Sequence, residues 1–245
     1  MLYNNDAANI GKYVQPQTAD VIIFDPPYGI GTTHLDLKKK KWKKTTEEWD
    51  QFASPDEQYS AYEKWLHLFI PLLKPTGSIF IFGSMHNIFM IGDLLQRKLQ
   101  CKIINTIVWN KVNAMFNITR TSIIEGTEYI IWAKPVNSKH FFNYEKSVEI
   151  GDGKQLRNVW AGTTQEIEVR RTGHPHQKPC WLVQRLLAIS CPPGGLVVDP
   201  MAGSGTTAVV CHYLNLKWIC IEKDTNFYEM AQRRITDEQR LSYVE

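Results

Sequence analysis

The sequence predicts an α/β protein built around an open sheet, and three observations indicate this class. Short apolar runs rich in β-branched residues, such as residues 21–24 and 196–198, alternate with longer stretches of helical periodicity. Two of these runs end in Asp-Pro, at Asp25 and Asp199, and the second continues through a glycine-rich turn into a helical stretch. The length of 245 residues suits one such domain with an embellishment.

The composition is that of an ordinary globular protein. The net charge of +3 is compatible with a nucleic-acid partner without proving one. No apolar run is long enough to span a bilayer, and no signal peptide is recognisable. The five cysteines are scattered, without a C-x-x-C pair, so we expect reduced thiols in a cytoplasmic protein and no metal site.

The N-terminal stretch leads to a stiff corner. Residues 1–5 predict a short strand, Asp6 the N-cap of a short helix, and residues 20–25 a buried strand. The prolines of Asp25-Pro26-Pro27-Tyr28 end that strand, because proline donates no backbone hydrogen bond and its φ is fixed. A carboxylate and an aromatic ring then lie at the C-terminal end of a strand, where open α/β sheets bind ligands. Taken alone, the corner is equally consistent with an ordinary turn.

A lysine-rich run follows the corner. It lacks apolar periodicity, so we expect a mobile basic loop within residues 31–50. Such runs are usually solvated surface, but the position beside the corner and the embedded Trp42 favour contact with nucleic acid. The candidate DNA-binding lysines are Lys38, Lys39, Lys40, Lys41, Lys43 and Lys44.

The middle of the chain alternates helices and strands. Ser54 and Pro55 predict the start of a helix. The periodicity predicts helices over residues 54–73 and 87–99, and strands over residues 78–82, 101–110 and 127–133. The polar connection between the last two strands carries three further candidate DNA contacts, Lys111, Asn113 and Arg120.

Residues 135–172 mix aromatic and basic side chains and read almost entirely as loop. This mixture suits base stacking and phosphate contact, and an irregular insertion with its own hydrophobic cluster fits equally well. We therefore divide one domain into residues 1–134, which carry the candidate catalytic corner, a small insertion (135–172) that would recognise the target, and residues 173–245, in which we look for a cofactor site.

The C-terminal part begins with His174-Pro175-His176-Gln177-Lys178-Pro179. The pattern then predicts, in order, a helix over residues 181–191, a strand over 196–198, a glycine-rich turn into a helix ending near 214, a strand over 218–221 and a helix over 226–235.

The glycine-rich turn fits G-x-G-x-x-A, with an acid, Glu222, at the end of the next strand. Glycines let a ligand approach the backbone, and the acid can accept hydrogen bonds from a ribose diol. No lysine follows Gly205, so this is not a phosphate-binding Walker loop. A second acid, Asp199, suits a cationic amino-acid tail better than a pyrophosphate, which favours S-adenosylmethionine over NAD. A turn used only for packing is the alternative.

Three motifs in this order resemble the β class of DNA amino-methyltransferases. Residues 25–28 match the catalytic D-P-P-Y, residues 174–179 resemble H-P-x-Q-K-P, and residues 199–207 resemble D-P-F-x-G-S-G-T-T with Met201 for Phe. Residues 158–160 resemble the D-V-W triplet of this class, with Asn158 for Asp. The resemblance covers nearly the whole chain except residues 38–44 and 135–172.

The resemblance implies a Rossmann-like S-adenosylmethionine-dependent methyltransferase fold. That fold has a mostly parallel, seven-stranded sheet with one antiparallel strand and a circularly permuted motif order. The implied catalytic residues are Asp25, Pro26, Pro27 and Tyr28. The implied cofactor-binding residues are Asp6, Asp25, His174, Gln177, Lys178, Pro179, Asp199, Pro200, Ala202, Gly203, Ser204, Gly205, Thr206, Thr207, Glu222 and Lys223.

The implied reaction is methylation of N6 of adenine in a specific sequence of double-stranded DNA, by base flipping and without a metal. Asp at position 25 favours adenine over N4 of cytosine, which stays the main alternative. An NAD-dependent oxidoreductase, an RNA or protein-glutamine methyltransferase and an inactive DNA-binding subunit fit less well. We further expect a bacterial, archaeal or phage source, a homodimer, and possible pairing with a cognate restriction endonuclease.

Overall fold

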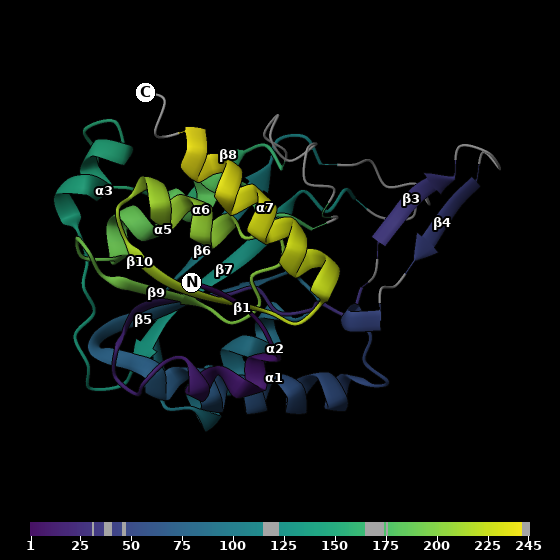
Figure 1. The fold of residues 1–245 in the computed structure, drawn as a ribbon, viewed down its shortest axis with the longest axis horizontal. Coiled ribbons are helices and arrows are strands. Elements are labelled where there is room, and N and C mark those ends of the chain that lie inside the picture. The colour runs from purple at the N-terminus through teal and green to yellow at the C-terminus, as the bar shows by residue number, and fades with distance from the viewer. Residues whose placement is uncertain are drawn as a thin grey trace.

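The computed structural model describes residues 1–30, 32–36, 41–45, 48–114, 123–164, 174 and 176–241. Its main sheet has eight strands in the order β1-β10-β9-β2-β5-β7-β6-β8 (Figure 1). Only β7 runs against its neighbours; every other pairing in this sheet is parallel. The strands are β1 (Leu2–Asn4), β2 (Ala19–Phe24), β5 (Leu73–Gly83), β6 (Cys101–Lys111), β7 (Thr127–Pro135), β8 (Val159–Gly162), β9 (Leu196–Asp199) and β10 (Lys217–Glu222).

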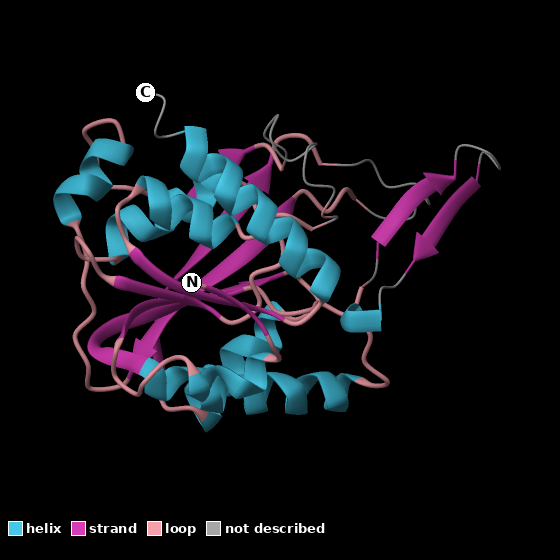
Figure 2. Ribbon diagram, viewed as in Figure 1, coloured by secondary structure: helices cyan, strands magenta, loops and turns pink. Residues whose placement is uncertain are grey.

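Helices cover both faces of this sheet, which gives three layers (Figure 2). On one face lie α1 (Pro55–Phe69) and α2 (Ile88–Asp93), and on the other α5 (Cys180–Ser190), α6 (Thr206–Tyr213) and α7 (Thr225–Leu241). The short turns η1 (Ala7–Lys12), η2 (Glu48–Asp50), η3 (Ile70–Leu72) and η4 (Leu94–Lys98) complete the described helical segments with α3 (Tyr144–Ile150). No helix in these described ranges is both long and apolar enough to cross a membrane.

The core follows from the strand sequences. Every residue of β2 is buried, so its side chains pack against both helical layers. Ile22 and Phe24 face Tyr62, Leu66 and Phe69 of α1. Val21 and Ile23 belong to a second cluster with side chains of α5. Burial on both faces explains why β2 reads as a continuous apolar run rather than an alternating one.

The strand order brings the motif ends together. Strands β2, β9 and β10 are parallel neighbours, so Asp25, Asp199 and Glu222 emerge at one edge of the sheet. Strand β6 ends at the same edge with Lys111, and the antiparallel β7 begins there, pairing Glu128 with Trp109. This carboxyl edge is where open α/β sheets bind their ligands.

Two expectations need correction. The sheet has eight strands rather than seven, because residues 135–172 contribute β8 and α3 instead of being nearly all loop. Within the expected basic loop, β3 (Thr32–Asp36) and β4 (Lys41–Thr45) pair as an antiparallel hairpin apart from the main sheet (Figure 1). Strand β4 carries Lys41, Lys43 and Lys44, whereas Lys38, Lys39 and Lys40 lie outside the described residues.

Candidate active site

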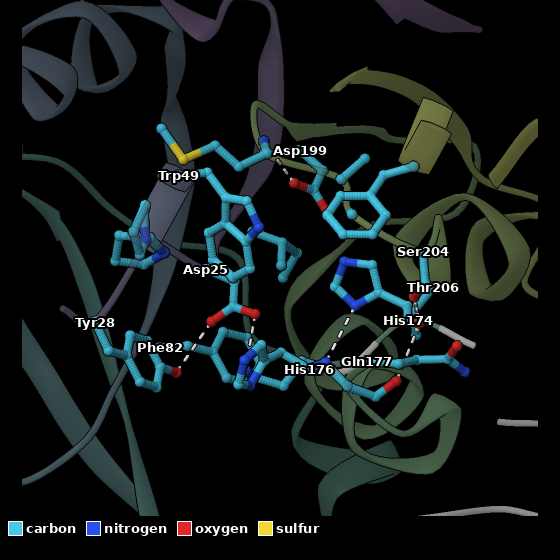
Figure 3. Close-up of a pocket in the computed structure, with 18 of the residues that line it drawn as sticks. Asp25, Tyr28, Trp49, Phe82, His174, His176, Gln177, Asp199, Ser204 and Thr206 are labelled. Carbon is cyan, nitrogen blue, oxygen red and sulfur yellow. Dashed lines mark hydrogen bonds and ion pairs between the residues drawn. The ribbon is translucent and has the colours of Figure 1, made fainter. Parts of the chain in front are cut away.

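A cavity of about 1150 Å³ opens at the carboxyl edge of the sheet. Two groups of predicted residues line it, as Figure 3 shows: Asp25 and Tyr28 on one side, and Asp199, Ser204 and Thr206 on the other. Of the predicted catalytic and cofactor-binding residues that are described, Pro179 and Gly205 are the ones outside the lining. The lining members are Asp6, Asp25, Pro26, Pro27, Tyr28, His174, Gln177, Lys178, Asp199, Pro200, Ala202, Gly203, Ser204, Thr206, Thr207, Glu222 and Lys223.

Side chains of α1 hold the Asp-Pro-Pro-Tyr corner by its backbone. The Tyr62 hydroxyl donates to the Pro27 carbonyl, and Gln58 donates to the Tyr28 carbonyl at 2.9 Å. Asn87 donates to the Tyr62 hydroxyl at 2.8 Å and fixes it in turn. Pro26 lines the cavity, and within the part of the chain that is described no donor reaches its carbonyl.

The Asp25 carboxylate is held by two side chains. The Lys178 ammonium lies 2.8 Å from Oδ2, and the Tyr28 hydroxyl donates to Oδ1 at 3.0 Å. Burial raises the pKa of Asp25, and the nearby Lys178 charge opposes that rise. Burial and the two carboxylates nearby raise the pKa of Tyr28 well above its ordinary value, so this hydroxyl keeps its proton and remains a donor.

A second carboxylate, Glu128, completes this cluster. Its Oε2 lies 3.4 Å from the Lys178 ammonium and 3.3 Å from the Tyr28 hydroxyl, and its Oε1 pairs with Lys111 at 2.7 Å. The sequence analysis did not single out Glu128, because it is the second residue of an antiparallel strand with no motif around it. Two carboxylates and two ammonium groups make this cluster formally neutral.

Two acids on the opposite side of the cavity are held mainly by the backbone. Asp199 accepts from the Met201 amide at 3.0 Å and from the Thr207 hydroxyl. Glu222 accepts from the amides of Gly203 and Asp224, each at 2.8 Å. Burial raises the pKa of Asp199 to about 7 and also raises the pKa of Glu222.

Neither of these acids has a cationic partner. No salt bridge in the described structure reaches Asp199 or Glu222, although Asp199 is 4% exposed. A buried carboxylate without a counter-charge favours a ligand that brings one. This charge pattern fits S-adenosylmethionine, whose sulfonium and amino groups are positive, better than an anionic dinucleotide.

The glycine-rich turn is anchored from behind by Arg234 of α7. Its guanidinium donates to the Thr206 hydroxyl at 2.9 Å and to the Ser204 carbonyl at 3.3 Å. The Thr206 hydroxyl in turn donates to the Lys178 carbonyl at 3.0 Å, which joins this turn to the 174–179 motif. Gly205 has φ of +77° and faces α7, where an added Cβ would lie 3.1 Å from that of Ala231.

Aromatic rings border the cofactor side. The His174 ring lies 4.3 Å from that of Phe227, and Trp49 lies edge-on to His176 at 5.7 Å. Burial lowers the pKa of His174 to about 3, so its imidazole is neutral at physiological pH. Sequence reasoning missed Trp49, Phe227 and Arg234, since no motif contains them.

The remaining predicted residues divide between the cavity and the surface. Asp6 caps η1 by accepting from the Ala8 amide, and its other oxygen pairs with Lys223 at 2.9 Å. Lys111 lines the cavity rather than an open surface, and Asn113 is exposed and accepts from the Thr164 amide. Arg120 lies outside the described residues. Among the described residues no group of three or more acidic, histidine or cysteine side chains could hold a metal ion.

The strand order and the cavity together define a Rossmann-like methyltransferase that depends on S-adenosylmethionine. Residues 19–233 match the model of the DNA methylase family (N6_N4_Mtase), and the chain belongs to this family. That membership decides against the NAD-dependent oxidoreductase considered above.

Relatives of known name cover nearly the whole chain. A type II methyltransferase of Streptococcus pneumoniae, M2.DpnII, is 33% identical over 242 residues, which are 97% of this chain and 90% of that protein. The crystal structure of M1.HpyAVI with S-adenosylmethionine has 28% identity and a TM-score of 0.72, covering 96% of this chain and 98% of the other. The cytosine-N4-specific PvuII DNA methyltransferase has a TM-score of 0.75, covering 97% and 90%, but 15% identity, so it supports the fold alone.

Proposed function

We propose that this DNA methyltransferase transfers a methyl group to the exocyclic N6 of adenine in a specific sequence of double-stranded DNA. The observation that carries the proposal is the corner at residues 25–28. It brings Asp25, Pro26 and Tyr28 to one cavity, with the predicted cofactor residues opposite.

The corner residues would act on the nucleophile. An exocyclic amine is a poor nucleophile, because its lone pair is conjugated into the ring. Hydrogen bonds from the amine to Asp25 and to the Pro26 carbonyl would draw the nitrogen out of conjugation and aim its lone pair away from both acceptors. Tyr28 would stack on the base and fix its plane. Most of the rate gain would then come from positioning and from preorganised acceptors.

The cofactor side would hold S-adenosylmethionine by charge and backbone contacts. When bound, it supplies a methyl group on a positively charged sulfur. Asp199 would face the cationic amino-acid portion, and Glu222 would accept hydrogen bonds from the ribose. The remaining contacts would come from the glycine-rich turn and from residues 174–179.

The base must leave the duplex to reach this cavity, which costs a few kcal/mol of lost stacking and pairing. We propose that the lysines of the hairpin region and its connection, with Asn113 and Arg120, contact the DNA backbone beside the cavity. A homodimer and a cognate restriction endonuclease remain predictions. The latter is supported by the type II naming of the relatives.

One experiment tests the proposal directly. The protein is incubated with labelled S-adenosylmethionine and unmethylated DNA, and the DNA is then digested to nucleosides. We expect the label in N6-methyladenine. Label found only in N4-methylcytosine would refute the adenine assignment, and an unlabelled digest would refute activity on DNA.

A further inference from the structure

The Asp25 carboxylate already has a donor on each oxygen: the Tyr28 hydroxyl on Oδ1 and the Lys178 ammonium on Oδ2. An incoming base amine brings a further donor to the same buried group. Each carboxylate oxygen can accept two hydrogen bonds, but three donors around one partly buried carboxylate crowd it, so we expect a resident donor to give way as the amine approaches within the 2.7 to 3.2 Å typical of an N–H···O bond. A buried ammonium or hydroxyl cannot be left without an acceptor, because the full desolvation cost of that group would then be incurred.

The acceptor that the displaced donors need is already in place. Oε2 of Glu128 lies 3.3 Å from the Tyr28 hydroxyl and 3.4 Å from the Lys178 ammonium, so each donor reaches it by a small movement. The other Glu128 oxygen is fixed by Lys111 at 2.7 Å, which keeps Oε2 directed at the two donors.

We propose that Glu128 is a positioning residue that receives the Tyr28 hydroxyl or the Lys178 ammonium when the target amine takes the place of that donor on Asp25. This inference rests on the proposed role of Asp25 as acceptor of the amine, and it holds for adenine or cytosine alike. The exchange moves no proton and breaks no covalent bond. Its driving force is that the amine gains an acceptor while neither resident donor loses one.

The charge states of the cluster support this exchange. Burial raises the pKa of Glu128, but Lys178 and Lys111 outweigh burial and hold that pKa below its ordinary value. Burial lowers the pKa of Lys178, but Asp25 and Glu128 outweigh burial and raise it. The Lys178 ammonium therefore stays charged on either carboxylate. Its position over the Tyr28 ring, 5.1 Å from the centroid, also favours a short movement between them.

The test compares two DNA duplexes that differ by one amine. Once the methylated sequence has been mapped on plasmid DNA, one duplex carries the normal target base and the other the same base without its exocyclic amine. Dissociation constants are measured for both with S-adenosylhomocysteine present. For Glu128→Gln we expect binding of the amine-bearing DNA to weaken roughly 10- to 100-fold, the range of one charge-assisted hydrogen bond. Binding of the amine-free DNA should not change.

Two further variants make the result decisive. Glu128→Asp keeps the carboxylate and should recover part of the preference for the amine-bearing DNA. Asp93→Asn removes an exposed carboxylate of α2 that pairs with Arg97, outside the cavity and outside residues 135–172, and should behave as wild type. If Glu128→Gln does not fold, the partial preference of Glu128→Asp is the deciding measurement, and an unreduced preference there would overturn the proposal.

Other outcomes also count against the inference. Equal weakening of both duplexes by Glu128→Gln would show a merely structural role, and an unchanged preference would show no role. Failure of the proposed function would give a different set of results. A product containing only N4-methylcytosine would refute the adenine assignment yet leave Glu128 testable with the cytosine pair of duplexes. Full activity of Asp25→Ala would overturn both proposals.

Discussion

The two sides of the cavity hold their carboxylates by different means. On the cofactor side, Asp199 and Glu222 accept from backbone amides of the turns that they border. On the base side, Asp25 is held by the side chains of Lys178 and Tyr28. A backbone amide can move only if the fold moves, whereas a lysine or tyrosine tip can change partner by rotation. Apart from the Thr207 hydroxyl on Asp199, the contacts on the first side are thus fixed by the fold, whereas those of Asp25 can change partner by side-chain rotation, as the proposed exchange requires.

The largest expected effect separates chemistry from cofactor binding. Asp25→Ala removes the proposed acceptor of the amine and should lower the rate of methyl transfer by at least about 100-fold, as for loss of one preorganised catalytic group. Affinity for S-adenosylmethionine should remain, because the backbone contacts opposite are untouched. Calorimetry showing that Asp25→Ala no longer binds the cofactor would contradict this separation of catalysis from cofactor binding.

The basic hairpin region gives the next effect, on DNA binding alone. Replacing Lys38, Lys39, Lys40 and Lys41 with Ser should flatten the log–log salt dependence of DNA binding by about 2 to 3 units when most of these lysines contact phosphate, since each phosphate contact contributes roughly 0.9. All sequences should be affected alike, because phosphate contacts carry no sequence information. Cofactor affinity should not change. A salt dependence identical to that of wild type would return these lysines to the role of solvated surface.

A smaller effect is expected for Asp199→Asn, which keeps the shape of the side chain but removes its charge. The affinity for S-adenosylmethionine should fall about 10-fold or somewhat more, the scale of one charge-assisted contact. The stability of the folded protein, by contrast, should increase at pH 8. The folded-state pKa of about 7 lies above the ordinary 3.8, so ionising Asp199 destabilises the fold as pH rises from about 4 to 7. The variant should therefore melt at a higher temperature than wild type at pH 8, and a lower melting temperature would contradict this assignment.

The smallest effect is a pH dependence of cofactor binding. A cationic ligand needs Asp199 ionised, and its pKa in the free protein is about 7. Affinity for S-adenosylmethionine should rise by about 10-fold in all as the pH rises to about 7 and then level off, since protonation removes the same charge as Asp199→Asn. Titration calorimetry at several pH values measures this. The Asp199→Asn variant should lack this rise, and the same rise in the variant would assign it to another group.

On both sides of the cavity, the sequence predicted the residues that lie in motifs and missed those that do not. Motifs occupy consecutive positions, so residues 25–28 and 199–207 could be recognised before their surroundings were known. Glu128, Phe227 and Arg234 could not, because each acts from a single position in an ordinary strand or helix, the first two in the cavity lining and Arg234 behind the glycine-rich turn. Their roles arise from which strands are neighbours, and above all from the reversed direction of β7, which brings its first residues to the carboxyl edge.

Helices and strands, too, were predicted well only where the local sequence pattern is strong. Strands buried on both faces and helices with clear caps, such as α1 after Ser54, were predicted within a few residues. The hairpin was missed because β4 is Lys-Trp-Lys-Lys-Thr, which lacks the alternation of a half-buried strand. Strand β8 was missed because four residues are too few to show the pattern of a strand. It is defined by its parallel pairing with β6, which the sequence alone does not reveal.

Lys178 belongs to both sides of the cavity at once. Its carbonyl accepts from Thr206 of the glycine-rich turn, and its ammonium lies on Asp25. If the two ligands bind as proposed, a shift of this residue would affect the sites of both, which would make it a physical route for thermodynamic linkage between them. Linkage is reciprocal: the factor by which bound cofactor changes the affinity for DNA must equal the factor by which bound DNA changes the affinity for cofactor. The order in which the ligands arrive can then alter the rates, but it cannot alter the stability of the ternary complex.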